Sequence, residues 1–475
     1  MKFSGFLTVA AFAVIAATPC YGGKKSVAKI KKNDSAKIES YFTAVLNGDK
    51  SDYPDKLPVA AKNIAEAERL VWSLWASANA AFEEDKLPEL TPLSDGGAAD
   101  EKTPSGVWKL GADDMQFFYG SKGDEVPAGG YPLYLCLHGS GDNEREFRVN
   151  LSWARYYADA PSVYFIPRSP GGGTQCRWYQ PTRQQTWERL LRQAYLSGDI
   201  DPDRVYFFGI SEGAYGSQRL ASFYADYLAG AGPIAGGEQI FWAPPANCAA
   251  TAFCLQTGEE DTMYGRKLLT EKVAEKWAAL QAAHPGYYEH KIDLQPGKGH
   301  GCDYTVTTPW LREHVRNPYP KYFYWENLAL GNINGEGAAF RRGFYNLYVK
   351  ERSTDDSDDM VRSCYEMTIE DNTVILNVDV VRHEFEEPVS GGVAPYEWRM
   401  VLDSSQSYER AQSGRVVIYL NDSLVDLSRP VRIVVNGREK FRGRLRADVG
   451  DMITSCGIFF DPARLYPVSV EVDVD

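Results

Sequence analysis

The segment DIDPDRVYFFGISEGAYGSQRLASFYADYL, residues 199–228, decides the fold of this chain. An apolar and aromatic run, RVYFFGI, leads into the pentad Gly209-Ile210-Ser211-Glu212-Gly213, and apolar residues at helical spacing follow. The pentad fits G-x-S-x-G, a pattern that is weak alone because glycine and serine are common. Between a strand and a helix, however, it is the setting of a nucleophile elbow, in which a strained turn exposes a serine hydroxyl. The segment therefore predicts Ser211 as a nucleophile, with a plain tight turn as the alternative.

The same alternation of short apolar runs and amphipathic stretches extends on both sides of this segment. Helices are predicted between the runs, at 144–158, 183–198, 212–230 and 266–284. Strands that alternate with helices of this length favour right-handed crossovers and a mostly parallel sheet covered on both faces, an α/β fold. The predicted strands cover 115–120, 131–139, 162–167, 204–210, 239–244, 251–258 and 287–296.

The rest of the chain divides by composition into further parts. We predict a signal peptide at 1–22, a helical extension and linker at 23–102, the catalytic domain at 103–331 and a β-sandwich-like accessory domain at 332–475. Helical periodicity is lost beyond Gly331, and Asn436-Gly437 is a hairpin signal. If the C-terminal part has its own core, residues 23–331 should fold alone. The aromatic segment 317–328 allows the alternative that the β-domain covers an apolar face of the hydrolase.

Charge and the N-terminal residues restrict the partners and the location of the protein. The 475 residues carry a formal charge of -13, which repels phosphate backbones, so nucleic acid is not an expected partner. The uncharged run from Phe6 to Ala17 is too short for a transmembrane segment and predicts secretion or export to the periplasm. Lipidation of Cys20 is disfavoured, because Pro19 stands where a small residue is required.

Seven cysteines remain after removal of the signal peptide. None forms a Cys-x-x-Cys array, and no ligand cluster or phosphate loop is present, so neither a metal nor a cofactor is expected. Export permits disulfides, and the pairs to test are Cys248 with Cys254 and Cys364 with Cys456.

A serine nucleophile needs a base and a carboxylate that orients the base. His300 lies in the glycine-rich loop GKGHG after a predicted strand, which favours it over the other histidines that follow Ser211. Asp261, on the loop after the preceding strand, is the expected acid, with Glu259 and Glu260 as alternatives. The competing histidines, at more structural positions, are His284, His290, His314 and His383.

An acyl-transfer site also requires two N–H donors for the developing oxyanion. The expected donors are the backbone N–H groups of Glu212 and of Ser140, with Gly139 as the alternative to Ser140. His138 precedes the serine and is expected to hold this loop by hydrogen bonding. Trp178 and Tyr179, in a loop after the 162–167 strand, could bind substrate by stacking on a sugar or aromatic ring, or could pack the loop onto the domain.

The segment DIDPDRVYFFGISEGAYG resembles the signature of α/β-hydrolase esterases of the esterase D, polyhydroxybutyrate depolymerase and feruloyl esterase group. The resemblance covers about 131–300 and implies an α/β-hydrolase fold with a Ser-His-Asp triad at Ser211, His300 and Asp261. Ala214 departs from the pattern, which has a second glycine there. The C-terminal part resembles an accessory β-domain of secreted bacterial hydrolases.

The function expected from these features is that of a serine esterase, with a small-molecule or polysaccharide ester as the substrate. A serine peptidase of the prolyl oligopeptidase kind and a non-catalytic binding protein with a relict hydrolase domain are the rival functions. The serine, base and acid would all be present in the peptidase, so sequence does not separate it from the esterase.

Overall fold

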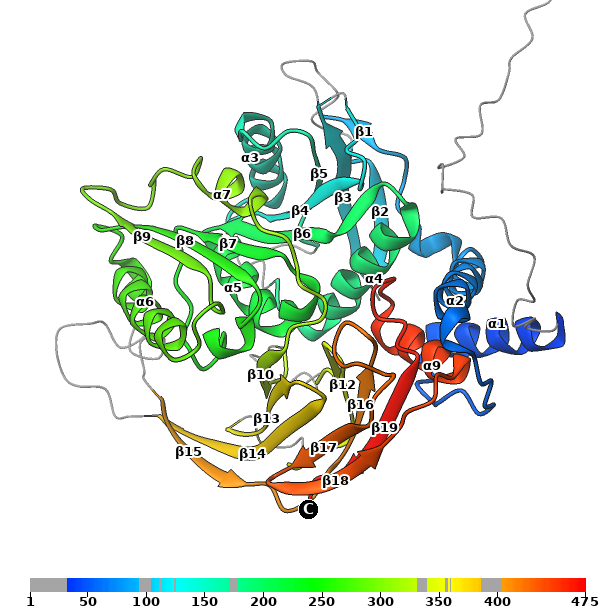
Figure 1. Cartoon of the computed structure of the whole chain (residues 1–475). Helices are drawn as coiled ribbons and strands as arrows, with labels where there is room; N and C mark the ends of the chain where they lie inside the picture. The colour runs from blue at the N-terminus through cyan, green and yellow to red at the C-terminus, as the bar shows by residue number, and fades with distance from the viewer. Residues whose placement is uncertain are drawn as a thin grey trace, which may run out of the picture.

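A computed structural model describes residues 32–93, 104–110, 113–123, 125–170, 178–330, 340–354, 358, 360–385 and 404–475. The predicted signal peptide, Cys20 and residues 171–177 lie outside this range. Figure 1 shows a large sheet flanked by helices in its upper half, a group of C-terminal strands below it, and two N-terminal helices at the side. In the described part of the chain, no helix is both long and apolar enough to cross a membrane.

The large sheet contains the predicted elbow strand near its middle. Its strands follow the order β1-β3-β5-β4-β6-β7-β8-β9, and β2 pairs with β3 at the same edge. From β4 to β9 neighbouring strands pair in parallel, whereas β3 runs antiparallel to β5 and β2. This order, with a single antiparallel segment at one edge, confirms the expected α/β-hydrolase fold. The strands span Thr91–Pro92 (β1), Gly106–Leu110 (β2), Asp113–Lys122 (β3), Tyr131–Leu137 (β4), Ser162–Pro167 (β5), Ile200–Ile210 (β6), Gly230–Ile234 (β7), Ala252–Gly258 (β8) and His290–Gln295 (β9).

Helices cover both faces of this sheet, as the alternating pattern requires. One face packs against α3 (Asn143–Tyr156) and α7 (Thr307–Arg312), through residues such as Phe147 and Leu311. The opposite face packs against α4 (Pro181–Ser197), α5 (Glu212–Tyr224) and α6 (Arg266–Ala283). Because both faces are covered, strands such as β4 are buried along their whole length and read as continuous apolar runs.

One predicted strand is wrong, and three strands of the large sheet, β1, β2 and β7, were not predicted. Residues 239–244 form turns, whereas β7 consists of Gly230-Ala231-Gly232-Pro233-Ile234. Glycine and proline have low strand propensity, so the sequence gives no local signal for β7. The strand needs small residues, because a Cβ at Gly232 would lie 2.4 Å from Cγ2 of Thr307. Close packing against α7 therefore decided the composition of β7.

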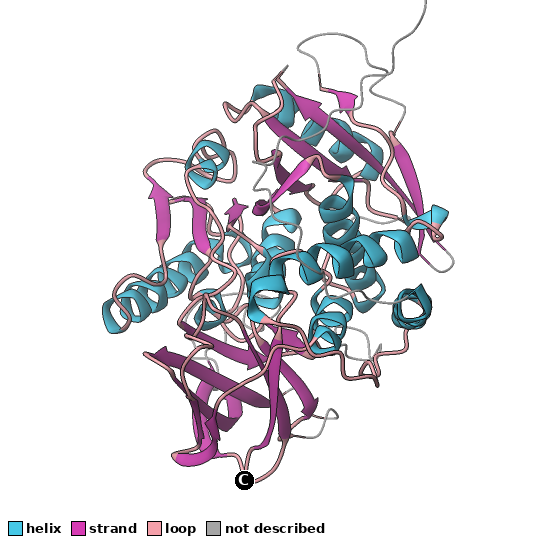
Figure 2. Ribbon diagram, turned by 45° about the vertical axis from the view of Figure 1, so that its right-hand side comes forward, coloured by secondary structure: helices cyan, strands magenta, loops and turns pink. Residues whose placement is uncertain are grey.

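The C-terminal region contains two further sheets, which Figure 2 shows as a separate group of strands below the helices. One has the order β10-β13-β14-β17-β18 with β15 paired to β14, and the other has the order β11-β12-β16-β19. Asn436 and Gly437 form the predicted hairpin between β17 and β18, both with positive φ angles, of 49° and 78°. The strands span Tyr322–Asn327 (β10), Gly343–Phe344 (β11), Leu347–Glu351 (β12), Val361–Glu370 (β13), Thr373–Phe385 (β14), Ser404–Arg410 (β15), Arg415–Leu420 (β16), Val431–Val435 (β17), Arg438–Gly443 (β18) and Val468–Asp473 (β19).

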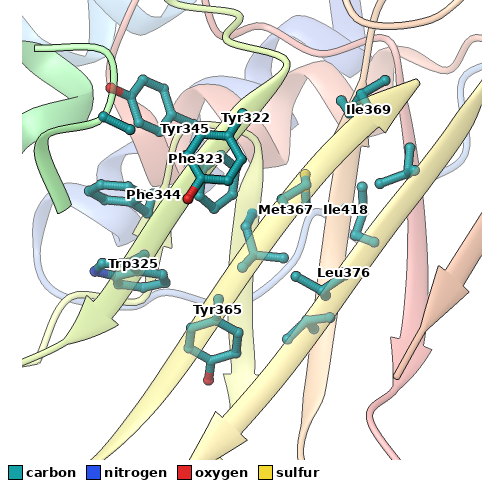
Figure 3. Packing of buried hydrophobic residues seen from close by; sticks show 14 of the residues in the cluster. Tyr322, Phe323, Trp325, Phe344, Tyr345, Tyr365, Met367, Ile369, Leu376 and Ile418 are labelled. Atoms are coloured by element: carbon teal, nitrogen blue, oxygen red, sulfur yellow. The ribbon is translucent and has the colours of Figure 1, made fainter. Parts of the chain in front are cut away.

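The core between these two sheets continues into the catalytic part of the molecule. Figure 3 shows Phe323 and Trp325 of β10 close to Phe344, with Met367, Leu376 and Ile418 beside them. The same apolar cluster also contains Phe253 of β8 in the large sheet and residues that pack near it, including Ala225 and Trp277. β10 lies before residue 332 but pairs with β13, so its aromatic side chains join the two parts. The domain limits given above remain predictions.

The N-terminal extension contains the two helices α1 (Lys32–Leu46) and α2 (Ile64–Asn79), which pack against a third helix, α9 (Val449–Phe459). α9 contradicts the expectation that helical periodicity ends at Gly331. Its residues are buried nearly all round, so it has no polar face and shows no amphipathic pattern. Asp448 caps it by accepting a hydrogen bond from the N–H of Gly450.

The proposed disulfide pairs are also wrong. Cys248, Cys254, Cys364 and Cys456 are all free and buried. Cys248 and Cys254 belong to apolar clusters on opposite faces of the large sheet. Cys364 lies on β13 and Cys456 on α9, within the cluster of the N-terminal helices. The pairs were proposed because their members lie in the same predicted domain, but membership of one domain does not tell which face of a sheet or which helix each thiol occupies.

Candidate active site

Ser211 occupies a sharp turn between the end of β6 and the start of α5. Its backbone angles, φ 57° and ψ −113°, lie in a region that residues with a side chain rarely adopt. Two backbone hydrogen bonds fix this conformation. The N–H of Ser211 donates to the carbonyl of Ile234 at 2.9 Å, and the carbonyl of Ser211 accepts from the N–H of Ala214 at 2.9 Å. A strained residue that its surroundings fix in this way points to a functional role.

The two glycines of the pentad allow this turn to sit against the neighbouring strand. A Cβ at Gly213 would lie 2.1 Å from the carbonyl oxygen of Leu137 on β4. A Cβ at Gly209 would lie 2.5 Å from the carbonyl oxygen of Gly213. Neither position can accept a side chain without displacing backbone. The helix therefore begins close to β4, with Ser211 at the carboxyl ends of the parallel strands.

The loops after β8 and β9 bring a carboxylate and an imidazole to the serine. Nε2 of His300 lies 3.1 Å from Oγ of Ser211, and Nδ1 of His300 lies 2.7 Å from Oδ2 of Asp261. Asp261 is buried, whereas the His300 side chain is 45% exposed, so the chain of contacts opens to solvent at the serine end. Glu259 and Glu260, the alternatives to Asp261, are both exposed. This arrangement can transfer a proton from the hydroxyl to the imidazole.

Arg266 is a member of this site that the sequence did not reveal. Its Nη1 donates to Oδ1 of Asp261 at 3.0 Å and its Nε donates to the hydroxyl of Tyr215 at 3.1 Å. Burial by itself would raise the pKa of Asp261, but the hydrogen bond to His300 and the charge of Arg266 lower it below its usual value. The sequence did contain one indication of this role. Arg266 is the first residue of α6, where a positive charge is unfavourable next to the helix dipole unless an acidic partner compensates it.

The other histidines have different partners. The ring of His284 stacks on Tyr322, with centroids 4.3 Å apart. Nδ1 of His290 lies 2.8 Å from the carbonyl of Tyr288. These contacts lie away from Ser211, as do the contacts of His314 with the carbonyl of Trp310 and of His383 with Glu326.

The loop at residues 138–141 lies beside the serine. A Cβ at Gly139 would be 3.4 Å from the Cβ of Ser211, and Glu212 is the first residue of α5. Ser140 is exposed in the turn that follows Gly139. The loop and the helix start thus both border the hydroxyl, and the donor roles of Glu212 and Ser140, or of Gly139 in place of Ser140, remain predictions.

His138 holds this loop, as expected. Its Nε2 accepts a hydrogen bond from the N–H of Ser169 at 3.1 Å, which leaves the ring proton on Nδ1. Nδ1 lies 2.7 Å from the carbonyl of Gly139 and donates to it. Burial lowers the pKa of His138 to about 4, so the ring is neutral near pH 7. A neutral ring with both nitrogens engaged fixes the loop and cannot act as a base there.

Trp178 and Tyr179 are both buried in this structure, as the packing alternative expects. Nε1 of Trp178 donates to the carbonyl of His138 at 3.0 Å, and the Arg219 guanidinium lies 3.8 Å above the Tyr179 ring. Trp178 has no exposed surface on which a sugar could stack. The geometry therefore favours support of the 138–141 loop over direct substrate binding by these two residues. No group of three or more His, Cys, Asp or Glu side chains with metal-binding geometry occurs within the described ranges.

Comparison with known proteins adds one relative from sequence. Poly(3-hydroxyalkanoate) depolymerase C of Paucimonas lemoignei is 30% identical over 212 residues, which are 40% of this chain and 45% of that protein. The match thus spans less than half of that relative. It confirms the resemblance to the depolymerase and esterase group. No protein-family profile matches the chain.

Solved structures similar to this chain include several esterases. A thermostable esterase is 21% identical, with a TM-score of 0.32 over 43% of this chain and 60% of that one. The acetyl xylan esterase from Aspergillus awamori is 13% identical, with a TM-score of 0.30 over 39% of this chain and 89% of that one. These TM-scores are too low to support a fold assignment, which rests on the strand order instead.

Proposed function

We propose that this protein is a serine hydrolase that cleaves carboxylic esters through an acyl-enzyme. The observation that carries the proposal is the chain of contacts from Oγ of the strained Ser211, through His300, to the buried Asp261. The order of the three residues along the chain, serine, acid and then histidine, is the order of α/β-hydrolases. The depolymerase match supports an ester as the bond that is cleaved.

Each step of the reaction has a residue to perform it. Nε2 of His300 accepts the proton of Ser211 as Oγ attacks the ester carbonyl. Asp261 accepts the Nδ1 proton in a hydrogen bond and stabilises the imidazolium that forms. The backbone N–H groups of Glu212 and Ser140 stabilise the oxyanion. His300 then protonates the leaving alcohol, and a water molecule activated by the same imidazole releases the acid.

The substrate proposed is an acyl ester on a polysaccharide, encountered after export through the predicted signal peptide. The name of the depolymerase relative adds polyesters of 3-hydroxy acids as a second ester class. Both are polymers with ester bonds reached from solvent, which suits a serine at the open carboxyl edge of the sheet. A small activated ester should be cleaved in either case.

A fluorophosphonate probe together with matched substrates tests the proposal. The full chain should be labelled at Ser211 and should hydrolyse p-nitrophenyl acetate, and Ser211→Ala should do neither. Absence of labelling would favour the relict binding protein. Cleavage of a peptide amide faster than the matched ester would favour the serine peptidase. Acetylated xylan, feruloylated arabinoxylan and poly(3-hydroxybutyrate), compared at equal ester concentration, then separate the substrate classes.

A further inference from the structure

A hollow lies between the catalytic part and the C-terminal sheet, away from Ser211. It has a volume of about 190 Å³ and is bordered by the second half of α6, by residues 240–246 and by strands β10, β13 and β15. This volume is smaller than the roughly 300 to 1,000 Å³ of typical drug-sized ligand sites, so the hollow suits a single small ring of a longer ligand. The residues that matter for its chemistry are Lys276, Tyr322, Tyr324, Glu366, Gln406 and Tyr408.

Strand alternation explains why polar and aromatic groups face this hollow. Phe323 and Trp325 of β10 point into the sandwich core, so Tyr322 and Tyr324 point to the other face. Tyr324 stands opposite Glu366 of β13, which therefore shares that face. The β-sheet thus turns a surface of tyrosines and polar side chains towards α6. An interface built only for packing would carry aliphatic residues at these positions, because unpaired polar groups are costly to bury.

Hydrogen bonds within the hollow leave several polar groups available to a ligand. The hydroxyl of Tyr408 donates to Oε1 of Gln406 at 2.9 Å, which orients the amide. Nε2 of Gln406 and Nζ of Lys276 have no hydrogen-bond or ion-pair partner among the residues that the structure describes. Oε1 of Glu366 has only a 3.5 Å contact with the hydroxyl of Tyr322. The hollow therefore presents donors and an acceptor around tyrosine rings.

The charges around the hollow balance. Lys276 contributes one positive charge and Glu366 one negative charge. Glu326, deeper in the hollow, is already paired with Arg362 and His383. A charged ligand would gain little here, whereas a neutral ligand rich in hydroxyl groups could use both donors and acceptors. The flat, apolar C–H face of a pyranose ring also matches the face of a tyrosine ring.

We propose that this hollow is a binding site for a neutral glycan chain, with Tyr324 and Tyr408 as stacking surfaces. Gln406 and Lys276 donate hydrogen bonds to sugar hydroxyls, and Glu366 accepts them. Binding itself is independent of the ester hydrolysis proposed above; the use of the site to hold an acylated polysaccharide rests on that function.

The position of the hollow makes it an accessory site. α6 has 18 residues, and Arg266 at its start contacts Asp261, whereas Lys276 and His284 border the hollow. At a rise of 1.5 Å per residue, these positions lie about 15 to 27 Å along the helix from Arg266. A short ester therefore cannot reach both places, but a polymer can. Binding there would raise the effective concentration of a polymeric ester at Ser211.

Calorimetric titration of the inactive full chain tests the site directly. Ser211→Ala protein is titrated with unesterified xylohexaose, cellohexaose and mannohexaose, so a failure of the proposed catalysis cannot affect the result. We expect at least one hexaose to bind with a Kd on the order of 1 mM or tighter. Adding Tyr408→Ala or Gln406→Ala should weaken binding by about tenfold or more. Tyr408 is 51% exposed and Gln406 is on the same edge strand, so both variants should fold.

Tyr156→Ala is the matched control, because Tyr156 is an even more exposed tyrosine, at 71%, on the distant helix α3. It should bind the hexaose as the parent protein does. The proposal is overturned if none of the three hexaoses binds at about 10 mM, or if Tyr156→Ala weakens binding as much as Tyr408→Ala. Binding of tetramethylammonium that is lost in Tyr408→Ala, without hexaose binding, would instead identify a cation site and also overturn it.

Discussion

Two groups of buried aspartate and arginine side chains occupy different regions of this molecule and have different consequences. At the serine, Asp261 is held by Arg266 on one oxygen and by His300 on the other. At the junction with the C-terminal region, Asp226 is paired with Arg341 and Arg464. Asp461 continues this second group, which we call the junction network, by binding both Arg464 and Arg316.

The difference lies in the side chain at which each group reaches solvent. In the junction network it is Asp203, a carboxylate paired with Arg316, and at the serine it is the imidazole of His300. Asp226, Asp461 and Arg464 have no exposed side-chain surface, so every charge in the centre of the junction network is used internally. The group at the serine ends in an imidazole that is partly exposed and contacts a strained hydroxyl. Both groups lower aspartate pKa values, so a perturbed pKa does not by itself identify an active site. What distinguishes the group at Ser211 is that its imidazole contacts a strained hydroxyl.

Removal of residues 332–475 should have the largest effect. It deletes Arg341, Arg464 and Asp461, leaves Asp226 buried without partners, and uncovers the apolar cluster around Phe323 and Trp325. We expect residues 23–331 to be insoluble, against the independent folding that the sequence suggested. Soluble yield and turnover of p-nitrophenyl acetate provide the measurement. A soluble fragment with activity within about tenfold of the full chain would show that the junction is dispensable.

Ser211→Ala should affect activity alone. Loss of the nucleophile is expected to reduce kcat by roughly 10⁴ to 10⁶. Removing one oxygen from a partly exposed turn should leave the urea midpoint of unfolding unchanged. Steady-state ester hydrolysis and urea denaturation of the same sample measure both. Retention of more than about a tenth of the activity would locate the nucleophile elsewhere.

Asp226→Ala should show the opposite behaviour. It leaves Arg341 buried without its ion-pair partner, and Arg464 keeps only Asp461, which is expected to cost about 3 to 5 kcal/mol of unfolding free energy. Turnover per folded molecule should be unchanged. Asp371→Asn, which breaks an exposed pair with Arg429, is the control and should leave the urea midpoint where it is. A fall in kcat without a fall in stability would contradict a purely structural junction network.

Arg266→Met should reduce kcat/KM by roughly 10 to 100-fold, because Asp261 loses a partner that keeps it ionised and oriented. Arg266→Lys should recover part of this activity, since lysine restores the charge but cannot reach both Asp261 and Tyr215. Tyr215→Phe, which removes the second contact alone, should have the smaller effect.

The pH dependence of kcat/KM shows whether Arg266 acts through Asp261. Without Arg266 the pKa of Asp261 rises, so on the acidic side of the profile kcat/KM should begin to fall at a higher pH. An unshifted profile would mean that Arg266 supports only packing.

The smallest expected effect is that of acid, which should lower ester hydrolysis at a higher pH than it lowers the stability contributed by the junction network. Burial would raise the pKa of Asp461, but the charges of Arg316 and Arg464 lower it to about 2, below the value near 3.9 of an unfolded chain. The stability that this residue contributes is therefore complete above about pH 4 and is lost as the pH falls towards 2. Activity should fall earlier, because only a neutral imidazole can accept the serine proton. Urea midpoints and ester turnover between pH 3 and 8 compare the two; activity that stays flat from about pH 5 to 8 would exclude an imidazole base.

The sequence was sufficient wherever the signal was local. The strand, the pentad and the helix around Ser211 are contiguous, so their periods and glycines predicted the turn. Asp261 and His300 follow strands in the expected order, and the structure brings these three side chains together. The Asn436-Gly437 hairpin was predictable for the same reason, because only such residues adopt positive φ at both turn positions without strain.

Only the tertiary structure decided the features that depend on distant segments. β7 has no strand propensity and is a strand because α7 and its neighbours pack against its glycines. α9 lacks a polar face because it is enclosed by the N-terminal helices. β10 joins the C-terminal sheet by pairing with β13, a contact that no local pattern encodes. Local periodicity reflects the exposed and buried faces of one element. An element that is buried on every side, or that is fixed by contacts with a distant segment, shows no such pattern.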